Sequence, residues 1–170
     1  MTDHLAALRI EPIQKDQNFK SFDCGEPSLN DYLVRYAWKN DQGNISKTFV
    51  LVDSDKNIYG YYSIYSASIG FEMLPEASAK HLPRYPIPCA RLARLAVTGS
   101  CQGKGAGARL LIDALHRINQ VSFELGIKFI IVDALNETAG KFYQHYGFIA
   151  LPGQDLKLFL PMETINLLFE

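Results

Sequence analysis

The chain has 170 residues, of which 48% are apolar and 21% are charged, and its formal net charge is −1 at pH 7. This length fits one domain with a substantial core, and the near-neutral charge argues against a general nucleic-acid-binding protein. We therefore expect a single domain over residues 1–170. No apolar run reaches membrane-spanning length, and the N-terminus lacks a basic region followed by an apolar core, so we expect a cytoplasmic protein without a membrane partner.

The first half of the chain predicts a strand, a helix and a hairpin. Residues 6–13 predict a first strand, and Pro27 suits the first turn of a helix. The apolar face of this helix consists of Leu29, Tyr32, Leu33, Tyr36 and Ala37. Residues 47–52 and 57–70 are rich in β-branched and aromatic side chains and predict a β-hairpin. In its second strand Tyr59, Tyr61 and Tyr65 share one face, and Tyr62 points to the other.

The second half predicts further strands and helices. Residues 71–85 predict a short helix and a loop, because Pro86 and Pro88 exclude a helix at the end of this insert. Residues 92–97 predict a strand, residues 105–125 a long helix ended by Gly126, and residues 127–133 an apolar strand covered on both faces. Asn136 is a candidate N-cap of a last helix, and two closing strands follow around residues 148–151 and 155–160.

The three cysteines are an odd number, with no C-x-x-C pair and no histidine at metal-ligand spacing. They therefore indicate neither a disulfide framework nor a zinc site. We expect Cys24, Cys89 and Cys101 to be free thiols, and we expect no metal.

A glycine-rich turn, residues 102–107, joins the strand 92–97 to the long helix. Its glycines leave N–H groups at the helix mouth without intrahelical partners and let a ligand approach the main chain. This predicts an anion site that suits phosphate. The turn is not a P-loop, because Lys104 is followed by Gly105 rather than by a hydroxyl residue. It is not a dinucleotide fingerprint either, because the G-x-G-x-x-G spacing and the preceding strand–helix alternation are missing.

Positive charge gathers around this turn. Between residues 80 and 117 seven basic residues accompany one acid, Asp113, which gives +6 and leaves −7 for the rest of the chain. The basic residues are Lys80, Arg84, Arg91, Arg94, Lys104, Arg109 and Arg117. A phosphate-bearing coenzyme accounts for part of this charge, and a polyanion would use the rest.

The turn resembles the Q/R-x-x-G-x-G/A loop of GNAT acetyltransferases, which cradles the pyrophosphate of acetyl-coenzyme A. Residues 139–148 resemble the A-x-x-F-Y-x-x-x-G-F element of the same family. The chain is most similar to the GNAT toxins of bacterial toxin–antitoxin pairs, which acetylate the amino group of aminoacyl-tRNA. Residues 22–33 match their F-x-C-G-x-x-x-L-(N/D)-x-(Y/F)-L segment, residues 61–63 a Y-Y-S/T strand, and residues 86–97 a P-I-P-x-x-x-L-A-R-L-A-V stretch. The similarity covers residues 16–161. The chain differs from these toxins in charge, since a tRNA-acetylating enzyme is expected to be more basic than pI 6.4.

The resemblance implies a GNAT fold of the α/β class, with a central, mostly antiparallel mixed sheet flanked by helices. The strands at residues 92–97 and 127–133 would form its splayed central pair. It also implies acetyl-coenzyme A as cosubstrate, bound by backbone groups of the strand at residues 92–97, by the glycine-rich turn and by Asn136. The alternative for Asn136 is that it only caps a helix. The implied cofactor-binding residues are Leu95, Ala96, Val97, Gln102, Gly103, Lys104, Gly105, Ala106, Gly107 and Asn136.

The resemblance also implies an acid catalyst. Tyr143 matches the tyrosine that protonates the leaving thiolate in the family, and a packed aromatic is the alternative reading. Arg91 and Arg94 are candidates to meet an RNA phosphate, and solvated surface arginines are the alternative. The general base stays open among Glu72, Glu76, His81, Asp133 and a chain of waters.

Three functions therefore remain open. The first is a toxin that acetylates the α-amino group of aminoacyl-tRNA and is restrained by a small ribbon-helix-helix antitoxin. The second is an ordinary small-molecule or protein N-acetyltransferase with no nucleic-acid partner. The third is a catalytically silent GNAT fold that only binds coenzyme A. In the relatives dimers are common, which makes a homodimer an expectation here too. The insert 71–85 is expected to form one wall of the acceptor cleft.

Overall fold

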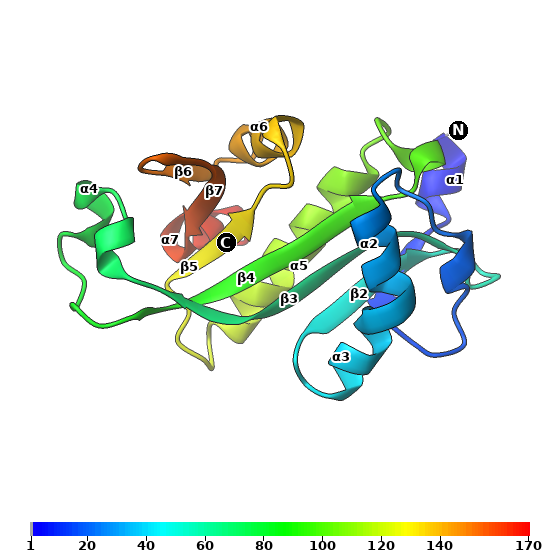
Figure 1. Cartoon of the computed structure of the whole chain (residues 1–170), viewed down its shortest axis with the longest axis horizontal. Helices are drawn as coiled ribbons and strands as arrows, with labels where there is room; N and C mark the ends of the chain where they lie inside the picture. Colours follow the sequence, from blue (N-terminus) through cyan, green and yellow to red (C-terminus); the bar gives the residue numbers. More distant parts are fainter. Residues whose placement is uncertain (1) are drawn as a thin grey trace. The chain divides into compact units, whose positions relative to one another are not determined.

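The computed structural model describes residues 2–170, and for residues 2 and 3 it describes the backbone only. The chain divides into two compact units. The first contains the residues up to Tyr65 together with Ala93–Leu115, and the second contains Ser66–Leu92 and His116–Glu170. Three elements contribute residues to both units: strands β3 (Ile58–Ile69) and β4 (Ile87–Val97) and helix α5 (Ala106–Val121). Figure 1 labels these elements.

The sheet of the first unit follows the order β1-β2-β3-β4. Strand β1 (Arg9–Pro12) pairs antiparallel with β2 (Lys47–Val52), which pairs antiparallel with β3. The predicted hairpin is thus confirmed, with β2 at the predicted bounds. The first strand is shorter than expected, because Ala6 belongs to helix α1 (Thr2–Ala6).

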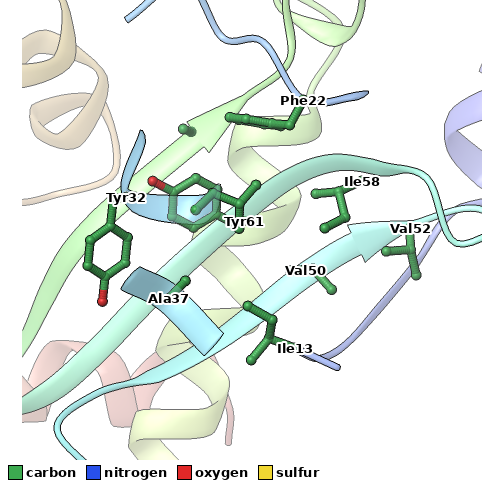
Figure 2. Packing of buried hydrophobic residues seen from close by; sticks show 10 residues of the cluster. Ile13, Phe22, Tyr32, Ala37, Val50, Val52, Ile58 and Tyr61 are labelled. Atoms are coloured by element: carbon green, nitrogen blue, oxygen red, sulfur yellow. The ribbon is translucent and has the colours of Figure 1, made fainter. Parts of the chain in front are cut away.

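A continuous helical segment packs beside this sheet. It consists of α2 (Pro27–Asp31), the π-helical turn η2 (Tyr32–Ala37) and α3 (Trp38–Gln42), and Pro27 starts it as predicted. Figure 2 shows Tyr61 of β3 beside Tyr32 and Phe22, within a cluster of buried apolar residues. The prediction that Tyr36 is buried with them was wrong, since its side chain is 53% exposed. A π turn bonds i to i+5, so residues four apart in it no longer align on one face.

The two faces of β3 contact different helices, as the alternation of its tyrosines predicted. The Tyr61 hydroxyl donates to the carbonyl oxygen of Leu29 in α2, at 2.7 Å. The Tyr62 hydroxyl donates to the carboxylate of Asp113 in α5. Both tyrosines are fully buried, and each has a hydrogen-bond partner for its hydroxyl, as buried tyrosines require.

The sheet of the second unit follows the order β3-β4-β5-β7-β6. Strand β5 (Phe129–Asp133) pairs parallel with β4, in a register that joins Leu92 to Val132. Strand β7 (Gln154–Pro161) pairs antiparallel with both β5 and β6 (Ile149–Leu151). The predicted class, a mixed and mostly antiparallel sheet flanked by helices, is confirmed. The splay of the β4/β5 pair stays a prediction.

Short helical elements complete the chain. The insert contains η3 (Phe71–Met73) and α4 (Glu76–Ala79), as predicted, and α6 (Glu137–His145) follows β5. Single turns η1 (Phe19–Ser21) and η4 (Gly99–Cys101) were not predicted, nor was the last helix α7 (Met162–Leu168). Helix α5 ends at Val121 rather than Leu125, and turn hydrogen bonds follow it. No helix within residues 2–170 has the length and apolar character needed to cross a bilayer.

Candidate active site

The glycine-rich turn (residues 102–107) leads from η4 into α5 and lies wholly in the first unit. Gly103 and Gly105 have φ angles of +73° and +88°, a region that L side chains rarely adopt. A Cβ atom built on either glycine would have no heavy atom within 4 Å, so the space beside both is open. The turn therefore has the conformation and the clearance that the predicted phosphate site requires.

A cavity of about 420 Å³ adjoins this turn. Lys104 and Arg109 contribute to its lining, and residues of α1 form another part of it. The Lys104 ammonium donates to the carbonyl oxygen of Ser100 at 2.9 Å, and the Arg109 guanidinium donates to those of Leu5 and Leu8 at 2.8 and 2.6 Å. Two cations beside an open glycine backbone fit the diphosphate of a coenzyme.

Hydrogen bonds between distant parts of the sequence hold the turn in place. The Gln102 side-chain amide donates to the carbonyl oxygens of Cys24 and Val97, at 2.9 and 2.8 Å. The Thr98 hydroxyl and the Gly99 N–H donate to the carbonyl oxygen of Asp23, at 3.0 and 2.9 Å. The Gln102 side chain thus supports the turn, and the Gln102 N–H donates to the carbonyl oxygen of Gly99 at 3.3 Å, so a contact of Gln102 with coenzyme A stays a prediction.

The segment at Asp23 is itself ordered by local hydrogen bonds. The Asp23 carboxylate accepts from the Gly25 N–H and the Asn30 amide, both at 3.0 Å, and Asn30 accepts from the Cys24 N–H at 2.9 Å. The Gly25 N–H and then the Asn30 amide hold the pKa of Asp23 below its ordinary value. Sequence reasoning missed this supporting role. The available signal was an aspartate two residues before a glycine, which is typical of an Asx turn.

Tyr143 and Asn136 belong to α6 in the second unit. Asn136 is the predicted N-cap, because its side-chain oxygen accepts from the Ala139 N–H at 2.9 Å. The Tyr143 side chain is 7% exposed, and its ring packs edge to face against Phe142 and Phe148, at centroid distances of 5.2 and 5.4 Å. Burial raises the pKa of Tyr143 above its ordinary value. Its hydroxyl therefore stays protonated at neutral pH and is able to donate a proton.

Alkaline titration should separate buried from accessible tyrosines. Burial raises the pKa values of Tyr61 and Tyr143, because it disfavours the charged phenolate. We expect both to stay protonated in the folded protein above the ordinary pKa of about 10. The unfolded chain releases these protons, so the stability they contribute is lost as the pH rises beyond that value. In an absorbance titration, Tyr143→Phe should remove one late-ionising tyrosine, and an unchanged late step would show that Tyr143 is accessible.

The two candidate arginines lie in different units and make different contacts. Arg91 forms an ion pair with Asp133, one of the candidate bases. Arg94 lies over the ring of Tyr32, at 3.7 Å from its centroid, in a cation–π contact. Neither is therefore a purely solvated arginine. The other candidate bases, Glu72, Glu76 and His81, are exposed in the insert.

The three cysteines are free thiols, as predicted, with Cys89 and Cys101 buried and Cys24 half-buried. Within the described residues, no group of three or more His, Cys, Asp and Glu side chains is arranged to hold a metal ion.

The chain belongs to the GNAT acetyltransferase family. The family model "Acetyltransferase (GNAT) domain" matches residues 25–163, which include the glycine-rich turn and Tyr143. The predicted enzyme class, an N-acetyltransferase, and the predicted GNAT fold are thus confirmed.

Within this family the chain is similar to toxins. It is 37% identical over 148 residues to the tRNA-acetylating toxin of Mycobacterium tuberculosis, covering 87% of this chain and 88% of that protein. It is 30% identical over 172 residues to the probable toxin TacT of Sinorhizobium fredii, covering 95% of both.

Solved structures of toxins are also similar to nearly the whole chain. AtaT complexed with acetyl-methionyl-tRNAfMet has 34% identity and a TM-score of 0.90, over 96% of this chain and 99% of that one. AtaTR bound with acetyl-coenzyme A has 32% identity and a TM-score of 0.84, over 97% and 99%. A tyrosine-to-phenylalanine mutant of AtaT, bound to the C-terminus of the antitoxin AtaR, has 32% identity and a TM-score of 0.84, over 96% and 98%.

Proposed function

We propose that this protein is a toxin that transfers the acetyl group of acetyl-coenzyme A to the α-amino group of aminoacyl-tRNA and thereby blocks translation. The observation that carries the proposal is the likeness, over nearly the whole chain, to AtaT in complex with acetyl-methionyl-tRNAfMet. The open glycine-rich turn supports the same cosubstrate, since its two positive-φ glycines leave room for a diphosphate.

The proposed mechanism assigns a role to each predicted site residue. Bound acetyl-coenzyme A supplies an acetyl group on a thioester, and its transfer to an amine releases the coenzyme as a thiol. The turn and the adjoining Lys104 and Arg109 hold the diphosphate. Backbone groups of residues 95–97 in β4 hold the pantetheine arm and polarise the thioester carbonyl. Asn136, whose side chain caps α6, orients that helix and adds a polar contact near the cosubstrate.

Tyr143 supplies the proton that the leaving sulfur needs. Its buried hydroxyl is protonated at neutral pH and donates that proton as the carbon–sulfur bond breaks. The attacking amine loses one proton in the same reaction, and solvent returns one proton to Tyr143. A chain of waters suffices as the base, because the α-amine of an aminoacyl ester is weakly basic.

The basic segment around the turn provides positive charge for an RNA. Lys80 and Arg84 are exposed in the insert, where the Arg84 guanidinium lies 5.7 Å from the centroid of the Phe71 ring. Arg91 and Arg94 contact Asp133 and Tyr32. We assign the first contact with the RNA backbone to Lys80 and Arg84. We assign contacts with RNA phosphates in the docked complex to Arg91 and Arg94.

Salt should weaken acetylation of charged tRNA much more than binding of acetyl-coenzyme A. Counterion release gives log K a slope of about −0.7 to −0.9 per phosphate contacted. In the double variant Lys80→Glu with Arg84→Glu, the apparent affinity for tRNA should fall and its salt slope should become shallower. Lys15→Glu with Lys20→Glu changes the net charge equally at exposed positions outside the segment and serves as the control. Equal losses in both double variants would contradict a local RNA site.

The proposal carries three further expectations. A partner antitoxin, of the ribbon-helix-helix class in our proposal, restrains the activity, in line with the AtaT–AtaR complex. The protein acts in the cytoplasm, where charged tRNA is found. Residues 1–170 form a single catalytic domain, which we expect to assemble as a homodimer.

The decisive test of the function is incubation with labelled acetyl-coenzyme A and a bulk pool of charged tRNA. A panel of polyamines, amino acids and basic peptides is assayed beside it. Label in the tRNA, lost when the aminoacyl ester is hydrolysed beforehand, is the expected result. Label in the panel but never in the tRNA would replace the toxin with an ordinary N-acetyltransferase, and label in neither would leave a fold that only binds coenzyme A.

A further inference from the structure

A second cavity, of about 210 Å³, lies in the second unit where β5 ends. The end of β3, the start of the insert, β4, β5 and β7 contribute to its lining. Arg91 pairs with Ile131 in the parallel register, and Asp133 pairs with Lys157 in the antiparallel one. Residues two apart on a strand share a face, so Ile131 and Asp133 point to the same side of the sheet. Met73 of the insert also lines this cavity, and a wall of the acceptor cleft formed by the insert stays a prediction.

The mouth of the cavity is charged and carries both signs. Arg91 and Asp133 form an ion pair there, with side chains 25% and 48% exposed, and Lys157 adds a second cation. Two cations and one carboxylate match a ligand that presents an amine close to an anionic group. The 3′ end of an aminoacyl-tRNA has this chemistry, with an α-amine on the terminal ester and a phosphodiester next to the same nucleotide.

The floor of the cavity is apolar. The buried apolar residues on this side of the sheet are Ile69, Ile131 and Leu151, which belong to one core cluster, and Met73 of the insert, 37% exposed, adds a further apolar side chain to the lining. A volume of about 210 Å³ is below the range of about 300–1,000 Å³ typical of pockets for drug-sized ligands. A space of this size suits one aliphatic or thioether side chain together with its amine.

We infer that this cavity is the subsite for the aminoacyl group of the acceptor and selects tRNAs charged with a neutral, apolar amino acid. The side chain enters the apolar floor, and Asp133 accepts a hydrogen bond from the α-amine. Arg91 and Lys157 face the phosphate of the terminal nucleotide. Met73, on the insert, limits the length of the side chain that the cavity accepts. This assignment rests on the proposed function, because it names which charged tRNA the enzyme acetylates.

A panel of individually charged tRNAs tests the inference. Acceptors charged with Met, Leu, Ile or Val should have higher kcat/KM values than those charged with Gly, Asp, Glu, Lys or Arg. One methylene in an apolar pocket changes such a ratio about 10- to 200-fold. Met73→Phe should lower kcat/KM for the longer side chains relative to the shorter ones. Leu167→Phe is the control, because Leu167 is 69% exposed in the same unit and lies outside the cavity lining.

A second variant tests the carboxylate. Asp133→Asn keeps the shape of the side chain and removes its charge, so KM for the preferred charged tRNA should rise at least about 10-fold. The acetyl-coenzyme A-induced shift in melting temperature should stay unchanged, which also verifies folding of the variant. Asp155→Asn, at an exposed position of the same unit, is the control.

The outcomes separate the two proposals. If the wild-type enzyme labels no charged tRNA, the proposed function fails, and this inference fails with it. If it labels charged tRNAs but without regard to the side chain, or prefers Gly or charged side chains, the function stands and the subsite assignment is overturned. The assignment is likewise overturned if Met73→Phe alters selectivity no more than Leu167→Phe does, or if Asp133→Asn has the KM of Asp155→Asn.

Discussion

Replacing Tyr143 by phenylalanine should lower turnover about 10²- to 10⁴-fold and leave the affinity for acetyl-coenzyme A nearly unchanged. The phenyl ring keeps the edge-to-face packing against Phe142 and Phe148, so the variant loses only the hydroxyl. Without that hydroxyl the sulfur must leave as an unprotonated thiolate. Single-turnover acetylation of charged tRNA measures the chemical step, and calorimetric titration measures the cosubstrate affinity.

Tyr146→Phe is the matched control for this prediction. Tyr146 is a half-buried tyrosine at the end of the same helix, and its ring packs edge to face against Phe142 at a centroid distance of 5.2 Å. Loss of the Tyr146 hydroxyl should change turnover by less than about threefold. Equal turnover in both variants would move the acid role to another group. If the protein is a toxin, expression of Tyr143→Phe should also be tolerated by cells that the wild type arrests.

Gly105→Val should abolish the stabilisation of the protein by acetyl-coenzyme A. At a ligand concentration of 100 times Kd, binding adds about 2.7 kcal/mol to the free energy of unfolding. For a chain of this size, that corresponds to an increase in melting temperature of about 5–10 °C. A valine at Gly105 would place its side chain in the open space beside the turn and force a φ of +88°, which costs about 1–2 kcal/mol.

Gly153→Val separates ligand loss from backbone strain. Gly153 has a φ of +72° in the turn between β6 and β7, and a Cβ there also has no neighbour within 4 Å. Both variants should therefore unfold at lower temperature than the wild type by a similar amount. Only Gly153→Val should keep the shift on addition of acetyl-coenzyme A. A full shift in Gly105→Val would show that the diphosphate binds elsewhere.

Local patterns were sufficient to predict much of the fold. Strand β2, the hairpin and the N-cap at Asn136 depend on residues close together in sequence, and the structure has all three. The helix after the turn was predicted too long because Val121, Phe123 and Leu125 continue an apolar pattern. These three side chains are 46%, 74% and 57% exposed, so the pattern there does not report burial. The short helix α7 has seven residues, too few for a clear period.

The candidate site was only partly predictable for a different reason. The glycine-rich turn is contiguous in sequence, so its conformation could be inferred from residue types alone. The cavity at the end of β5 is lined in part by Arg91 and Asp133, which are 42 residues apart and meet only through strand pairing. The register between strands far apart in the sequence depends on which of their apolar faces pack together, and local patterns alone do not predict that pairing. Asp133 was therefore one of several candidate bases, and its ion pair with Arg91, a candidate for RNA contact, was not predicted.

The attachment of the turn to the Asp23 segment affects the order of events during folding. Asp23 and Thr98 are 75 residues apart, and Cys24 and Gln102 are 78 apart. Contacts of such separation form late, because the intervening chain must first be ordered. On the ribosome, residues 22–25 emerge well before their partners, and the turn gains its supports only after more than half of the chain has been made. A nascent chain therefore stays without a coenzyme site, and thus without activity, until β4 and the start of α5 have joined the earlier strands.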